Sequence, residues 1–172
     1  MVDRDSFVRE ERRQMSTRIN SLYHIGILVP DIDAAIERYG EIYGVTFRPP
    51  IEVTSCRVVQ RNGSDAPFTC RLSYSTRGPM YVELVEAQGD GLWSAANIGG
   101  IHHIGMWSED PKAQAEQLAA DGSTWEASMY LDTETIGIIF VRHQGALIEL
   151  VTGKLRAPLI EWTEGRAAHV MP

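Results

Sequence analysis

The sequence lacks an excess of basic residues, and this absence limits its partners. Its 172 residues include 16 Lys and Arg against 23 Asp and Glu, a formal net charge of −7. An acidic chain repels phosphate backbones and anionic lipid headgroups. We therefore expect no general binding to nucleic acid and no attachment to an acidic membrane surface.

Long apolar runs are also missing. No segment approaches the roughly 18 residues that span a bilayer. Residues 1–20 are rich in charge and lack the apolar core of a signal peptide. We therefore expect a leader at 1–20 and a cytoplasmic protein. In that compartment the only two cysteines, Cys56 and Cys70, are expected to be free thiols.

What the chain does contain is an internal repeat. Segments 22–44 and 101–122 align so that His24 falls on His103, and an Ile-Gly pair follows each histidine. Each segment opens with a short apolar stretch suited to a buried strand. An acidic turn with a proline follows, and then apolar residues at helical spacing. Each helix is expected to end just before a glycine.

The second parts of the two halves also correspond. "MYVELVEAQ" at 80–88 aligns with "ALIELVTGK" at 146–154, so that Glu83 falls on Glu149. Both segments alternate as strands do, which places each glutamate on one face with its neighbours two residues away. Two more strands fit between the outer strands of each half, at 48–60, 67–76, 125–132 and 135–144.

Each half therefore reads as strand, helix, strand, strand, strand. This order predicts an α+β fold of two pseudo-symmetric βαβββ modules arranged around one cleft. The expected boundaries are a leader at 1–20, a first module at 21–88, a glycine-rich linker at 89–99, a second module at 100–152 and a C-terminal extension at 153–172.

The repeat gives a candidate metal site: His24, Glu83, His103 and Glu149. Two imidazoles and two carboxylates suit a first-row divalent ion, whose charge the carboxylates balance. A lone histidine in an apolar strand is more often a core residue, and a strand glutamate can face solvent. The occurrence of both residue types in both halves favours metal binding. His102, adjacent to His103, is expected to be a packing or supporting residue rather than a ligand.

The pattern "YHIGILVPD … YVELVE … GGIHHIGMW … ALIELV" resembles the vicinal oxygen chelate superfamily, which includes glyoxalase I and methylmalonyl-CoA epimerase. The resemblance covers about residues 21 to 152. It implies paired βαβββ modules, one divalent ion (Zn, Ni, Co, Mn, Mg or Fe) on the four residues above, and chelation of adjacent substrate oxygens. Epimerases of this type carry an additional carboxylate base on the third strand of the first module. The segment 67–76 has no acid, and Glu52 belongs to the preceding strand or turn.

Such an ion acidifies a C–H bond next to a chelated carbonyl. By the resemblance, Glu149 is the expected base and Glu83 the alternative, in an isomerase, epimerase or lyase acting on a small oxygenated acid or thioester. Residues that could select the substrate also have ordinary interpretations as packed aromatics or solvated arginines. They are Arg57, Arg71, Tyr74, Trp107, Trp125, Phe140 and Arg142, together with Met106 and Met129.

Two other functions remain open at this level. One is an Fe(II) dioxygenase of the same fold, which four candidate ligands disfavour because they leave few open positions. The other is a metal-free protein that sequesters small molecules in an apolar cleft, which the presence of both His/Glu pairs disfavours. A homodimer is a further prediction. The C-terminal extension could cover the cleft or form a dimer contact.

Overall fold

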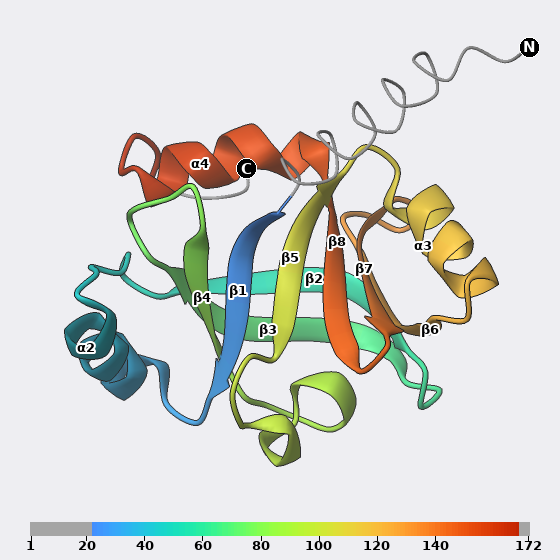
Figure 1. Ribbon diagram of the computed structural model, residues 1–172, viewed down its shortest axis with the longest axis horizontal. Helices are drawn as coiled ribbons and strands as arrows, with labels where there is room; N and C mark the ends of the chain where they lie inside the picture. Colours follow the sequence, from blue (N-terminus) through green and yellow to red (C-terminus); the bar gives the residue numbers. More distant parts are fainter. Residues whose placement is uncertain (1–21, 169–172) are drawn as a thin grey trace, which may run out of the picture.

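The computed structural model describes residues 22–168, and in it eight strands form one closed barrel (Figure 1). The order of strands around the barrel is β1-β4-β3-β2-β6-β7-β8-β5. The first module comprises β1 Leu22–Val29, α2 Ile32–Tyr43, β2 Ile51–Gln60, β3 Asp65–Tyr74 and β4 Tyr81–Glu86. The second comprises β5 His103–Ser108, α3 Pro111–Ala120, β6 Thr124–Tyr130, β7 Ile136–His143 and β8 Ala146–Thr152. The predicted α+β fold of two βαβββ modules is confirmed, and the predicted leader lies outside the described residues.

The two modules meet along two seams. Within each module the first and last strands pair in parallel, β1 with β4 and β5 with β8. Between modules, β1 pairs antiparallel with β5, and β2 pairs antiparallel with β6. The expected cleft is therefore the interior of a barrel that a single chain closes, and the first strands of the two modules lie side by side.

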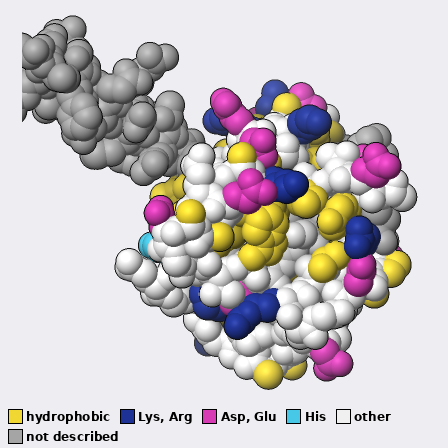
Figure 2. Space-filling view, turned by 90° about the vertical axis from the view of Figure 1, so that its right-hand side faces the viewer, with side chains coloured by type: hydrophobic (Ala, Val, Ile, Leu, Met, Phe, Trp, Pro, Cys, Tyr) yellow, Lys and Arg dark blue, Asp and Glu magenta, His cyan; other side chains and the backbone are white. Residues whose placement is uncertain are grey.

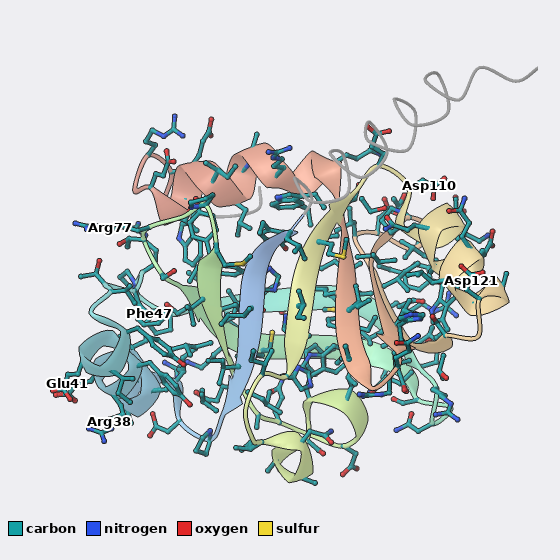
Figure 3. The ribbon with its side chains drawn as sticks, in the orientation of Figure 1. Arg38, Glu41, Phe47, Arg77, Asp110 and Asp121 are labelled. Atoms are coloured by element: carbon teal, nitrogen blue, oxygen red, sulfur yellow. The ribbon has the colours of Figure 1, made fainter. Side chains whose placement is uncertain are left out.

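Two helices cover the outside of the barrel. Asp31 and Asp110 cap the N-termini of α2 and α3, each accepting a 3.0 Å hydrogen bond from the backbone N–H three residues on. Gly44 ends α2 in the left-handed conformation, with φ 63°, as its position in the sequence predicts. Figure 3 shows Asp110 and Asp121 at the two ends of α3. Within residues 22–168, no helix is long and apolar enough to cross a membrane.

Segments outside the repeated modules close the two ends of the barrel (Figure 1). The linker forms the short 3₁₀ helices η1 Gly91–Trp93 and η2 Ala95–Asn97, and Trp93 packs against Phe68 and Phe140. At the opposite end, the C-terminal extension forms η3 Gly153–Leu155 and α4 Arg156–Thr163. Trp162 of α4 is buried in a cluster with tyrosines of the barrel. The linker is therefore part of the packed core as well as a connection.

Candidate metal centre

One histidine and one glutamate from each module meet inside the barrel. His24 and His103 are 0% and 2% exposed, and Glu83 and Glu149 are 5% and 6% exposed. One possible ligand atom from each of the four residues lies within 4.8 Å of all the others. The four positions that the repeat singles out therefore converge on one point.

The separations between these atoms fit a shared ion. His24 Nε2 lies 2.8 Å from His103 Nε2, 3.3 Å from Glu83 Oε2 and 3.1 Å from Glu149 Oε2. His103 Nε2 lies 2.9 Å from Glu83 Oε2 and 3.6 Å from Glu149 Oε2. Two ligands at right angles, each about 2.1 Å from one ion, are roughly 3 Å apart. The four residues could therefore hold a divalent metal.

A glycine of the opposite module makes room for each imidazole. In the pairing of β1 with β5, His24 lies opposite Gly105 and Gly26 lies opposite His103. A Cβ atom at either glycine would overlap the imidazole that faces it. The Ile-Gly that follows each histidine in the repeat thus serves the histidine of the other module.

The same glycines set the positions of the glutamates. Gly26 is the register partner of Glu83 on β4, and Gly105 is the register partner of Glu149 on β8. Each imidazole crosses a glycine toward the glutamate beyond it. As a result, the shorter His–Glu contacts join residues of different modules, and neither module alone can form the site.

We predict that Gly105→Ala disrupts the site. The added Cβ would displace the His24 ring, and overpacking of this kind costs about 1–3 kcal/mol of stability. Thermal unfolding and metal titration would measure both effects. The matched control is Gly153→Ala, where the added Cβ would meet only Ser108 O, at 3.8 Å. Unchanged metal affinity in Gly105→Ala would show that the ring does not need this space.

A protonated histidine offsets part of the negative charge at the site. Burial lowers the pKa of His24, but the charges and hydrogen bonds of Glu83 and Glu149 outweigh it and raise this pKa to about 9. Burial acts to raise the pKa of Glu83, but the positive charge of His24 and its hydrogen bond to this carboxylate hold it well below its usual range. Without an ion, the cluster therefore keeps a proton on His24 near neutral pH.

The hydrogen bonds of His102 determine which nitrogen of His103 is available. His102 Nε2 lies 2.9 Å from the Leu92 carbonyl, which can only accept, so Nε2 carries the proton. His102 Nδ1 then accepts from His103 Nδ1–H, 3.0 Å away. This leaves His103 Nε2 directed at the cluster. The interpretation of His102 as a supporting residue therefore has a specific structural basis.

The two glutamates are held unequally. Glu83 Oε2 has the close contact to His103, and a side-chain hydrogen bond links Glu83 to Tyr74. Burial and the negative charge of Glu83 raise the pKa of the Tyr74 hydroxyl well above its usual value, so this hydroxyl stays protonated. Glu149 Oε2 is buried and lies 3.1 Å from His24 Nε2, but it has no hydrogen bond of good geometry among the described residues. An oxygen without a partner beside two imidazole nitrogens is what a cation would satisfy.

A cavity adjoins the cluster inside the barrel, and several of the candidate substrate residues line it. Tyr74, Trp107, Phe140 and Met129 are on its wall together with Glu83, His103 and Glu149. No other carboxylate lines it in the described part of the chain. Asp65 at the start of β3 is exposed and paired with Arg57, and Glu52 is exposed on β2. The absence of a further acid, noted in the sequence, therefore extends to the cavity.

The structure does not bring the other candidates to this cavity. β-Bulges shift the alternation of the two strands: Arg57 lies within the one between Ser55 and Val58 in β2, and Trp125 directly precedes the one before Ala127 in β6. Trp125 consequently packs in the outer cluster that includes α3.

The remaining three lie outside for simpler reasons. Arg71 alternates with inward-facing Cys70 and Leu72, and it forms 2.9 Å ion pairs with Asp33 and Glu86. Arg142 is near the end of β7 and pairs with Glu126 at 2.9 Å. Met106 packs in the same outer cluster as Trp125.

Several solved structures have a fold similar to that of this chain. A variant of the Streptomyces coelicolor methylmalonyl-CoA epimerase, in complex with 2-nitronate-propionyl-CoA, is 26% identical over 77% of this chain and 94% of its own, with a TM-score of 0.51. A methylmalonyl-CoA epimerase in complex with methylmalonyl-CoA and NH4+ is 25% identical over 77% and 94%, with a TM-score of 0.52. The methylmalonyl-CoA epimerase from Mycobacterium tuberculosis is 22% identical over 80% and 91%, with a TM-score of 0.51.

No significant match is found among curated protein sequences. The model of the Glyoxalase/Bleomycin resistance protein/Dioxygenase superfamily matches residues 23–152, which include both modules and all four clustered residues. The match confirms the resemblance that the repeated motifs suggest. On this basis the chain belongs to the Glyoxalase/Bleomycin resistance protein/Dioxygenase superfamily.

Proposed function

We propose that the protein is a divalent-metal-dependent enzyme that removes a proton from the carbon next to a carbonyl of a small oxygenated acid or thioester. The reaction is an isomerisation, an epimerisation or an elimination. The observation that carries the proposal is the buried set His24, Glu83, His103 and Glu149, with its ligand atoms within 4.8 Å of one another. The two relatives at 25% and 26% identity are named as epimerases, which supports proton removal and return.

His24, His103 and Glu83 would hold the ion throughout, with Glu149 as the fourth ligand. An ion bound there supplies Lewis acidity, which lowers the pKa of a C–H bond beside a chelated carbonyl. Glu149 is proposed as the base because its Oε2 has a 3.1 Å contact to His24 but no hydrogen bond of good geometry among the described residues, whereas Glu83 lies 2.9 Å from His103 and hydrogen-bonds Tyr74. Glu149 accepts the proton and returns it to the same carbon or to its neighbour.

A hydrogen-exchange assay tests this function directly. The protein loaded with Zn²⁺, Ni²⁺, Co²⁺, Mn²⁺, Mg²⁺ or Fe²⁺ would be incubated in deuterated water with 2-oxo acids, hemithioacetals or acyl-CoA esters. Incorporation of deuterium next to the carbonyl, followed by NMR, is expected with at least one ion and to cease when the ion is chelated. Oxygen uptake with Fe²⁺ and no exchange would instead favour a dioxygenase. If no ion binds in titration, the metal-dependent proposal fails.

We predict that His102→Leu weakens metal binding about 10–100-fold, because removing a partner that orients a ligating histidine has effects of this size. Leucine cannot accept from His103 Nδ1–H, whereas the amide oxygen of His102→Asn can, so the asparagine variant should retain most of the affinity. Imidazole ¹⁵N shifts of the metal-free protein would report whether His103 keeps its proton on Nδ1.

The control for His102 is His143→Leu. His143 hydrogen-bonds Ser123 and lies on the end of β7, apart from the cluster. Its substitution should leave metal affinity unchanged. Equal affinities for the His102→Leu variant and the unchanged protein would remove His102 from the site.

A further inference from the structure

The cavity beside the cluster has walls that are almost entirely apolar. Its side chains come from both modules and from the segments that close the barrel ends. The wall includes Phe68, Leu72, Trp93, Met129, Ile138 and Phe140. Phe68 and Phe140 both contact Trp93, with ring centroids 4.4 and 5.3 Å apart, which gives the cavity an aromatic end.

Positive charge is missing from this wall. Of the described residues, no lysine or arginine lines the cavity, and the carboxylates and the histidine on its wall, Glu83, Glu149 and His103, belong to the cluster itself. Arg57 and Arg71 are turned outward, Arg142 lies near the end of β7, and all three pair with acids on the surface of the barrel. Figure 2 shows one face of the molecule, where basic and acidic side chains surround a central group of hydrophobic ones.

The C-terminal extension completes the enclosure. Leu155 of η3 and Leu159 of α4 contribute to the wall, and both lie beyond the residues 23–152 that match the superfamily. This part of the cavity is therefore a feature of this chain's own extension. It adds branched aliphatic surface and no charge.

We propose that the substrate presents two adjacent oxygens to the cluster and places an uncharged aromatic or branched aliphatic body in this cavity. The inference rests on the proposed function and specifies its substrate class. Placing an apolar group against apolar walls removes both surfaces from water, which makes the free energy of binding more favourable. A second carboxylate or a phosphate on the same body would be buried without a cationic partner, which is costly.

Hydroxamates test this preference, because each presents two adjacent oxygens on a body that can be varied. The full chain loaded with Co²⁺ would be titrated with acetohydroxamate, benzohydroxamate and succinate monohydroxamate, following the visible spectrum of the ion. We expect benzohydroxamate to bind at least about tenfold more tightly than acetohydroxamate, because its ring buries more apolar area. Succinate monohydroxamate, with its free carboxylate, should bind most weakly.

Met129→Trp and Met80→Trp provide a matched pair of variants. Met129 lines the cavity, so the larger side chain should fill it and remove the advantage of benzohydroxamate over acetohydroxamate. Met80 is 47% exposed and lies outside this cavity, so its substitution should change nothing. Toluene binding to the metal-free protein and to each variant, followed by NMR, gives a second measurement that does not depend on the ion.

The outcomes separate this inference from the proposed function. Equal affinity for the three hydroxamates, or a preference for succinate monohydroxamate, overturns the apolar substrate class and leaves the metal site intact. Toluene binding that Met129→Trp abolishes, together with no hydroxamate binding to the Co²⁺-treated protein, supports the apolar preference and overturns the metal-dependent function. Toluene binding that Met129→Trp leaves unchanged overturns the placement of the substrate body.

Discussion

Replacing Glu149 with glutamine is expected to lower metal-dependent hydrogen exchange by about 10²–10⁴-fold, because a positioned general base contributes a factor of this size. Glutamine keeps the shape of the side chain but cannot accept the proton. The measurement is deuterium incorporation per metal-loaded protein, so that a change in metal occupancy is not mistaken for a change in chemistry. Circular dichroism would check that the variant is folded.

Two further variants make the result specific. Glu83→Gln should reduce metal affinity more than Glu149→Gln does, because Glu83 is proposed to hold the ion throughout, whereas Glu149 is proposed to act as the base. Glu109→Gln, at an exposed acid after β5, should behave as the unchanged protein does. If Glu83→Gln abolished exchange at full metal occupancy and Glu149→Gln did not, the roles of the two glutamates would be reversed.

The four clustered residues could be found from sequence because the repeat fixes their register. A histidine in the first strand and a glutamate in the last strand of each half occupy equivalent positions, so symmetry brings the two sets together. The repeat did not reveal that each histidine lies closer to the glutamate of the other module than to that of its own. Gly26 and Gly105 were visible as repeated residues, but their role depends on the pairing of β1 with β5, which no local pattern specifies.

The residues that line the cavity were harder to predict because their selection depends on which way each side chain faces. Tyr74 and Arg71 are three residues apart in β3, so strand alternation places them on opposite faces of the sheet. Arg57 and Trp125 lie beside bulges, which reverse the alternation without any signal as distinctive as a glycine turn. Phe140 and Arg142 are two residues apart in β7, so alternation places them on the same face. Arg142 nevertheless lies near the end of the strand, where it pairs with Glu126.

The barrel ends show a second limit of local patterns. The linker contains four glycines in 89–100 and suggested flexibility, yet Trp93 is 3% exposed and packed between two phenylalanines. Closure of the barrel creates a hole at each end, and the nearest non-repeated segments fill it with their large apolar residues. The sequence left open whether the extension covers the cleft or forms a dimer contact, and Leu155 and Leu159 on the cavity wall fit the first of these. A homodimer remains a prediction.

Metal affinity is expected to rise by about a hundredfold between pH 7 and pH 9, because binding must displace one proton from His24 and each pH unit below its pKa costs tenfold. The pKa of His24 in the metal-free protein is about 9, raised by Glu83 and Glu149 against the effect of burial. The stability of the metal-free fold changes with pH in the opposite direction. A raised histidine pKa stabilises the metal-free fold most below pH ~6.5, and this contribution is lost as pH rises through about 9.

Competition with a metal indicator of known pH dependence would measure the affinity at pH 7, 8 and 9, and calorimetry in buffers of different ionisation enthalpy would count the protons released. About one proton per ion is expected at pH 7. Thermal unfolding of the metal-free protein should show a melting temperature that falls over the same interval. An affinity that is independent of pH, with no proton released, would mean that His24 is neutral before the ion arrives. The negative charge of the two carboxylates would then have to be offset in another way, and the protonation derived for the buried cluster would be wrong.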